Sequence, residues 1–223
     1  IEAFIEGANR GYYALEMDLR VSSDGIFYIC HDDVFLPYLF VDTQLHNLPM
    51  ASYTWDQLKN LEIKNTRNNQ TYYATLTRLE DYLEVIQEYD VHAIIELKWT
   101  NGINNNDTRN IAKLIELVQS YGVYEKTTFF TSMQTVLTTI RTNYPDASLM
   151  YLSGASTTTQ ANIDWAITHK MSMGIAHNII TQDIVNQLHS AGLYVNAYTV
   201  NSVADVTRLQ SLGVDFITTD DLT

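Results

Sequence analysis

Apolar and polar side chains alternate along residues 14–21, close to the start of the chain. The odd-numbered positions there are all apolar, whereas the even-numbered positions include Glu16, Asp18 and Arg20. Side chains of a strand point alternately to its two faces. The pattern therefore predicts a strand with one apolar and one charged face.

A turn signal, residues 22–25 (Ser-Ser-Asp-Gly), separates this strand from a second apolar run that ends at His31 and Asp32. About ten residues between two strands are too few for a helical crossover, so we expect the second run to fold back antiparallel. This β-hairpin would return His31 to the level of Glu16 and Asp18.

Three further segments before residue 90 carry recognisable signals. Apolar residues at helical spacing over 1–8 predict an opening helix. Residues 33–53 contain two prolines and predict an irregular loop, which a short capped helix starting at Thr54 would follow. Thr77 and Glu80 have the spacing of a capping box, which predicts a helix beginning at Thr77.

From residue 93 onward, strand-like and helix-like segments alternate regularly. The predicted strands are 93–97, 128–132, 148–152, 171–176, 193–200 and 215–219. The predicted helices are 107–121, 133–143, 158–168, 181–191 and 202–212. Such alternation favours a parallel sheet covered by helices.

The fold class we predict is α/β, a (β/α)8 TIM barrel with a β-hairpin insertion after the Glu16/Asp18 strand. Seven main strands can be counted, and the barrel needs eight, so we expect the first strand to precede Ile1. A doubly wound open sheet is the alternative, although no glycine-rich phosphate loop follows a strand. The sequence predicts one domain over residues 1–223.

Composition restricts the classes of partner. The chain has 223 residues and a formal net charge of −13, which opposes binding to nucleic acid or to an anionic membrane surface. No apolar run approaches the roughly 18 residues of a transmembrane segment. The single cysteine, Cys30, fits a cytoplasmic location and leaves secretion or the cell surface open.

A second informative pattern spans Ile94–Lys98, where Glu96 and Lys98 share one strand face. Both faces of a parallel barrel strand are covered, so we expect Glu96 and Lys98 to point into the barrel mouth, as Glu16 and Asp18 do. Three converging carboxylates repel one another unless a cation compensates, and Mg²⁺ or Ca²⁺ is the natural choice for oxygen ligands. An ion-pair network of these carboxylates with Lys98 and Arg20, without a metal, is the alternative.

Five runs together resemble the glycerophosphodiester phosphodiesterase family, and they occur in the family's order and approximate spacing: 15–25, 30–32, 95–98, 198–201 and 213–220. The resemblance implies metal-dependent hydrolysis of a small-molecule glycerophosphodiester into glycerol 3-phosphate and an alcohol. It implies one divalent cation bound by Glu16, Asp18 and Glu96. His31 would be one of two acid/base histidines, and Lys98 would stabilise charge on the phosphate.

The sequence also departs from the family pattern. The family begins with a strand ending in His-Arg-Gly, followed by Pro-Glu-Asn, and we expect these motifs and the partner histidine upstream of Ile1. Tyr198 stands where tryptophan is usual, and Met133 stands where phenylalanine is usual. The resemblance implies that both line the substrate pocket on the side of the leaving group.

Two other functions remain open from the sequence. The chain could be a catalytically impaired relative that acts as a metal- or phosphodiester-binding domain. It could also be a barrel enzyme with Lys98 as a Schiff-base nucleophile, although neighbouring carboxylates would hold that amine in its charged form. The sequence specifies neither the alcohol part of the substrate nor the oligomeric state.

Overall fold

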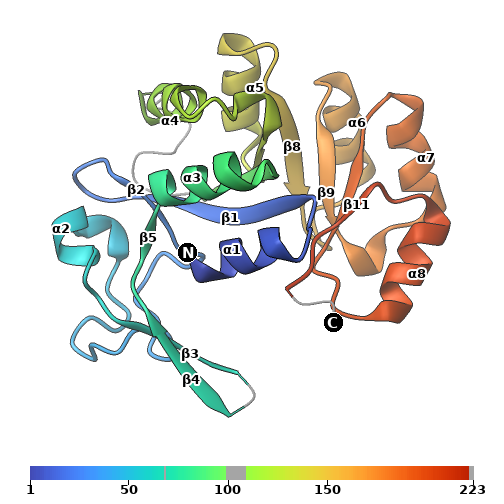
Figure 1. The fold of residues 1–223 in the computed structure, drawn as a ribbon. Helices are drawn as coiled ribbons and strands as arrows, with labels where there is room; N and C mark the ends of the chain where they lie inside the picture. The colour runs from blue at the N-terminus through green and yellow to red at the C-terminus, as the bar shows by residue number, and fades with distance from the viewer. Residues whose placement is uncertain (68, 99–108, 221–223) are drawn as a thin grey trace. The chain divides into compact units, whose positions relative to one another are not determined.

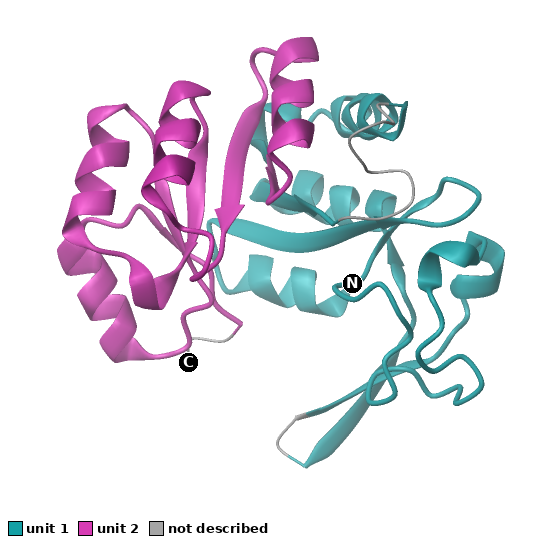
Figure 2. Cartoon of the chain, turned by 180° about the vertical axis from the view of Figure 1, so that it is seen from behind, with its two compact units in different colours: residues 1–128 teal, residues 129–223 magenta. Residues whose placement is uncertain are grey.

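The computed structural model describes residues 1–67, 69–98 and 109–220 (Figure 1). Contacts along the chain group these residues into two compact units, Ile1–Thr128 and Phe129–Thr223 (Figure 2). Each unit combines strands with helices. No helix in the described ranges combines the length and the apolar character that crossing a bilayer requires.

The sheet of the first unit is built around β1 (Ala14–Val21). It pairs in parallel with β6 (His92–Leu97) and antiparallel with β2 (Phe27–Ile29), so the predicted hairpin is confirmed. β2 pairs antiparallel with the short β5 (Thr77–Arg78). The odd-numbered side chains of β1 are all buried, as the alternation predicts.

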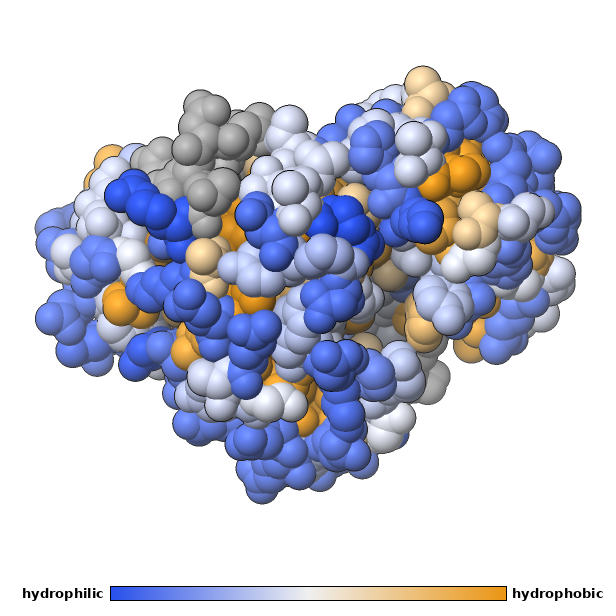
Figure 3. Space-filling view, turned by 90° about the horizontal axis from the view of Figure 1, so that it is seen from above, coloured by the Kyte–Doolittle hydropathy of each residue, from blue (hydrophilic) through white to orange (hydrophobic). Residues whose placement is uncertain are grey.

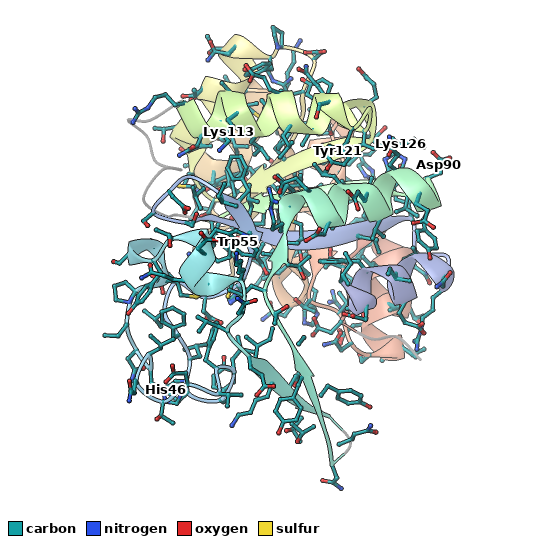
Figure 4. The ribbon with its side chains drawn as sticks, turned by 60° about the vertical axis from the view of Figure 1, so that its left-hand side comes forward. His46, Trp55, Asp90, Lys113, Tyr121 and Lys126 are labelled. Carbon is teal, nitrogen blue, oxygen red and sulfur yellow. The ribbon has the colours of Figure 1, made fainter. Side chains whose placement is uncertain are left out.

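Helices α1 (Glu2–Asn9), α3 (Leu79–Tyr89) and α4 (Arg109–Ser120) belong to the first unit. α3 buries five apolar or aromatic side chains along one face, and the ring of Phe4 in α1 meets that of Tyr82 edge-on at 4.9 Å. The 3-10 helix η2 (Tyr124–Lys126) directly precedes β7 (Thr127–Thr131). Lys126 of η2 forms an ion pair with Asp90, the residue that follows α3 (Figure 4).

The predicted capping box of α3 is wrong by one residue. Thr77 lies in β5, and the Asp81 carboxylate accepts a hydrogen bond from the backbone N–H of Arg78 at 3.1 Å. Pairing of β5 with β2 keeps Thr77 in extended backbone, so the helix begins only at Leu79. The local capping signal was therefore overridden by a tertiary strand contact.

Residues 33–76 form an insertion with its own core. The loop contains η1 (Met50–Ser52) and leads to the predicted short helix α2 (Trp55–Leu58) and then to a hairpin of β3 (Ile63–Arg67) and β4 (Gln70–Ala74), which projects as a two-stranded ribbon (Figure 1). Five side chains of the insertion are buried in this core, Phe35, Phe40, Met50, Leu58 and Leu76, together with Tyr28 of β2 and the adjacent Cys30. The irregular loop is thus packed rather than loosely solvated.

The second unit continues the strand and helix alternation. Its strands follow the order β11-β10-β9-β8-β7, and pairing is parallel from β8 to β11. The strands are β7 (Thr127–Thr131), whose first two residues belong to the first unit, β8 (Ser148–Ser153), β9 (Ser172–Ala176), β10 (Val195–Tyr198) and β11 (Phe216–Ile217). This sequential order among the described strands matches consecutive barrel strands and lacks the reversal of a doubly wound sheet.

The helices of the second unit are α5 (Gln134–Asn143), α6 (Gln160–Thr168), α7 (Gln182–Ser190) and α8 (Val203–Leu212), with η3 (His177–Ile179) after β9. The last three helices begin in the same way. The hydroxyls of Thr159, Thr181 and Ser202 each accept a hydrogen bond from the backbone N–H three residues later. These N-caps stabilise the start of each helix. They also explain why the starts of these three helices could be predicted from the sequence to within two residues.

Candidate active site

Three carboxylates converge at one end of the β1 and β6 pair. Parallel pairing places Asp18 beside Glu96 in register, and Glu16 lies two residues earlier on the same face of β1. One carboxylate oxygen from each residue lies within 4.8 Å of those of the other two. The structure therefore brings together the three residues that the sequence analysis assigned to a metal.

Lys98 lies directly beside this acidic triad (Glu16, Asp18 and Glu96). Its Nζ is 2.8 Å from Glu96 Oε1 and 3.0 Å from Asp18 Oδ1. Its backbone N–H donates to the carbonyl of Leu19 at 3.3 Å, which fixes the residue at the end of β6 against β1. The predicted grouping of Lys98 with the carboxylates is thus present.

Burial and charge act in opposite directions on this group. Burial raises the pKa of Glu96, whose side chain is 13% exposed, although the hydrogen bond and charge of Lys98 lower it. Burial alone would lower the pKa of Lys98, but Glu96 and Asp18 outweigh it and the net pKa lies above its ordinary value. Lys98 consequently remains an ammonium group at neutral pH, which argues against a Schiff-base nucleophile.

His31 lies just beyond the end of β2. The preceding residue, Cys30, donates its backbone N–H to the carbonyl of Asp18 at 3.0 Å, so His31 returns to the level of the triad as expected. The imidazole is 69% exposed, and its Nδ1 lies 3.2 Å from Asp32 Oδ1. The pKa of Glu96, which burial raises, is lowered in part by the positive charge of His31 when the imidazole is protonated.

Asp32 is a site residue for which the sequence analysis gave no role. Its carboxylate Oδ1 lies 3.2 Å from Nδ1 of the imidazole, so this contact leaves Nε2 as the ring nitrogen available for proton transfer. The adjacency of histidine and aspartate in residues 30–32 was the available signal.

Met133 and Tyr198 belong to the second unit. The hydroxyl of Tyr198 donates to the carbonyl of Ser153 at 3.1 Å, and its ring meets Phe130 edge-on. Met133 precedes α5, and its backbone N–H donates to the hydroxyl of Thr131 at 3.3 Å. Their substrate-binding role stays a prediction.

The donor set of the triad fits a hard divalent cation. Calcium–oxygen distances are about 2.3–2.6 Å, so two ligands on opposite sides of one ion lie about 5 Å apart. The separation of up to 4.8 Å between the carboxylate oxygens satisfies this limit. Carboxylate oxygens are also the ligands that Mg²⁺ and Ca²⁺ prefer.

Comparison with known proteins identifies the family. The model of the "Glycerophosphoryl diester phosphodiesterase family" matches residues 1–223. The chain belongs to this family. The sequence resemblance is therefore confirmed, and the chain is assigned to the phosphodiesterase class of enzymes.

Three relatives of this phosphodiesterase family member resemble it in sequence or fold over nearly its whole length. A glycerophosphodiester phosphodiesterase of Bacillus altitudinis is 24% identical over 98% of this chain and 86% of its own. A crystal structure from Silicibacter pomeroyi, a candidate glycerophosphoryl diester phosphodiesterase, has a TM-score of 0.86 and 21% identity over 99% of this chain and 84% of its own. A phosphodiesterase of Oleispira antarctica, solved with the product sn-glycerol-3-phosphate, has a TM-score of 0.79 and 20% identity over 97% and 85% of the two chains. The predicted α/β barrel class is confirmed by these shared folds.

Proposed function

We propose that this member of the family hydrolyses glycerophosphodiesters to glycerol 3-phosphate and an alcohol, with one divalent cation, Mg²⁺ or Ca²⁺, held by Glu16, Asp18 and Glu96. The observation that carries the proposal is the acidic triad with Lys98 beside it, in a chain of a phosphodiesterase family. The product complex of the Oleispira antarctica relative supports the same product class.

The three carboxylates carry three negative charges when ionised, and Lys98 places one positive charge beside Asp18 and Glu96. A divalent cation held there would supply Lewis-acid stabilisation of charge that develops on the phosphoryl oxygens. The Glu96 side chain is more enclosed than that of Asp18, at 13% against 21% exposed, so its ionised form gains more from such a partner.

Lys98 contributes a fixed positive charge at the same place. Its raised pKa keeps the ammonium charged across the neutral range, and its Nζ is held by Asp18 and Glu96 rather than by solvent alone. A charge that is already oriented stabilises a developing oxyanion without reorganisation at the moment of reaction. We assign to Lys98 the stabilisation of the phosphate.

His31 carries the proton. Hydrolysis breaks the bond between phosphorus and the alcohol oxygen and, over the whole reaction, places the oxygen of one water on phosphorus. The water gives up one proton, and the departing alcohol oxygen gains one. Asp32 holds Nδ1, so Nε2 of His31 is the atom that gives or takes the proton. Met133 and Tyr198 are proposed to contact the alcohol part of the substrate.

The test is hydrolysis of a panel of glycerophosphodiesters by the full-length protein, followed through release of glycerol 3-phosphate. We expect EDTA to abolish turnover and Mg²⁺ or Ca²⁺ to restore it. His31→Ala should lower kcat by about 10²- to 10⁴-fold.

His169→Ala is the matched control, because its imidazole bonds the carbonyl of Trp165 at the end of α6. It should leave kcat unchanged. Turnover that persists with EDTA and with His31→Ala would contradict the proposal. Binding of the diester without any turnover would instead support the alternative of a binding domain.

A further inference from the structure

Arg20 is a buried cation on the face of β1 that carries the site. It follows Glu16 and Asp18 at the next even-numbered position of the strand, and it is only 6% exposed. A buried guanidinium requires hydrogen-bond acceptors for its donors. The acceptors that the Arg20 guanidinium contacts therefore indicate which part of the backbone this side chain holds in place.

Two successive backbone carbonyls accept from Arg20. Its Nε donates to the carbonyl of Cys30 at 2.9 Å, and its Nη2 donates to the carbonyl of His31. β2 ends at Ile29, so these carbonyls belong to the irregular backbone just after the strand. The planar guanidinium reaches both at once because its donors form a fixed fork.

Cys30 is anchored from two other directions. Its N–H donates to the carbonyl of Asp18 at 3.0 Å, and its side chain is 7% exposed within the core of the insertion, with Sγ 3.8 Å from Met50 Sδ. The backbone leading into His31 is thus tied to β1, to the insertion core and to Arg20. The imidazole of His31, in contrast, is mostly exposed.

We propose that Arg20 is a positioning residue for His31: its guanidinium fixes the backbone from which the imidazole reaches the departing oxygen of the substrate. This inference rests on the proposed acid/base role of His31. It assigns to Arg20 a task other than charge balance within the acidic triad. A lysine would keep the charge but present a single ammonium group, which lacks the planar fork that satisfies both carbonyls.

A double-mutant cycle tests whether Arg20 acts through His31. The variants are Arg20→Lys, His31→Ala and the double variant, assayed as the full-length protein with a divalent cation. Because a misplacement of about 1 Å costs on the order of 10²-fold in rate, Arg20→Lys should lower kcat for an alkyl glycerophosphodiester by about 10- to 100-fold. In the His31→Ala background the same change should alter kcat by less than about twofold.

The leaving group supplies a second readout. A p-nitrophenyl phosphodiester releases a weakly basic phenolate that needs little proton transfer. Arg20→Lys should therefore slow this substrate much less than an alkyl diester. A purely structural loss would slow both substrates equally.

Arg141→Lys is the matched control, because Arg141 also clamps backbone carbonyls, those of Pro145 and Ala147 in the second unit. It should leave kcat unchanged. Hydrogen exchange gives a readout that does not depend on turnover: in Arg20→Lys, the amide of Cys30 should exchange at least about tenfold faster, whereas in Arg141→Lys it should not.

The outcomes separate this inference from the proposed function. Suppose that His31→Ala loses activity, but that kcat and the exchange rate of the Cys30 amide are the same in Arg20→Lys as in Arg141→Lys. The inference then fails and the proposed function stands. An equal loss from Arg20→Lys in the wild-type and His31→Ala backgrounds also overturns the inference. If His31→Ala keeps full activity while Arg20→Lys speeds exchange at Cys30, the proposed role of His31 fails and the anchoring of its backbone stands.

Discussion

At the scale of single residues, the charge state of Lys98 distinguishes between two reaction types at the site. Its Nζ lies between Asp18 and Glu96, and their charges hold its pKa above the ordinary value despite burial. An amine in that state is a poor nucleophile but a good electrostatic partner for a phosphate. The residue therefore favours phosphoryl chemistry over Schiff-base chemistry.

The buried thiol of Cys30 predicts how the free energy of unfolding changes with pH. Burial raises the pKa of its thiol from the ordinary 9.0 to about 11. Between these values the unfolded chain loses the proton while the folded chain keeps it, so the free energy of unfolding falls as the pH rises. The stabilisation is complete below pH 9 and is lost as the pH approaches 11.

Urea unfolding of the wild type and of Cys30→Ala from pH 8 to pH 11 measures this effect. The wild type should lose about 2 kcal/mol more than the variant over that range. Groups that do not interact with Cys30 contribute equally to both proteins and cancel in the difference. Tyr28 does not cancel, because burial and then the charge of the Cys30 thiolate raise its pKa, so its titration adds to the difference in the same direction. Parallel pH profiles for the two proteins would show that the thiol does not titrate as described.

At the scale of elements, the close approach of β9 to a neighbouring aromatic side chain explains why one strand position is glycine. A Cβ atom added at Gly174 would lie 2.5 Å from the ring of Phe130 and 3.4 Å from Met150 Sδ. Such an overlap forces side chains or backbone to move in a packed interior.

Gly174→Ala should therefore lower the free energy of unfolding by about 1–3 kcal/mol. Gly154→Ala is the control, because its added Cβ would meet neighbours only at 3.7 and 3.9 Å, and it should change stability little. Phe130→Leu should recover part of the loss in the Gly174→Ala background, which thermal unfolding of the four proteins measures. Additive effects of the two substitutions would contradict the predicted clash.

The elements also show which features the sequence encodes. The described strands and helices of residues 92–98 and 109–217 follow their predicted positions, because burial of one face requires apolar side chains at a regular period. Residues 107 and 108 of the predicted helix 107–121 lie outside the described residues. The β3–β4 hairpin was not predicted, because the strand residues of β4 are all exposed and carry no such period. The alternation along β1 and β6 was sufficient to predict that the side chains of the acidic triad converge. The contacts of Arg20 could not be predicted, because their acceptors lie in irregular backbone after β2, which no periodic pattern encodes.

At the scale of the whole molecule, charge sets the conditions for an anionic substrate. The formal net charge is −13, and hydrophilic side chains cover most of the face in Figure 3. This field repels phosphate groups at long range. A substrate with a phosphodiester therefore needs local positive charge, for which Lys98 and a bound divalent cation are the proposed sources.

The family model matches residues 1–223, and the fold is shared with a solved structure over 99% of the chain. The central claim is that Glu16, Asp18 and Glu96 form a site for one divalent cation rather than a metal-free ion-pair network with Lys98. Both arrangements contain the contacts of Lys98 with Asp18 and Glu96, and they differ in whether a cation is bound. Direct measurement of cation binding distinguishes them.

Calorimetric titration of Ca²⁺ and of Mg²⁺ into the full-length protein and its Glu96→Gln variant is that measurement, with Glu84→Gln on α3 as a carboxylate control outside the triad. The account predicts one saturable site in the wild type and in Glu84→Gln. Loss of one ligand charge should weaken binding by at least about tenfold in Glu96→Gln. Absence of saturable binding of either cation, or equal affinity in the wild type and Glu96→Gln, would contradict the account.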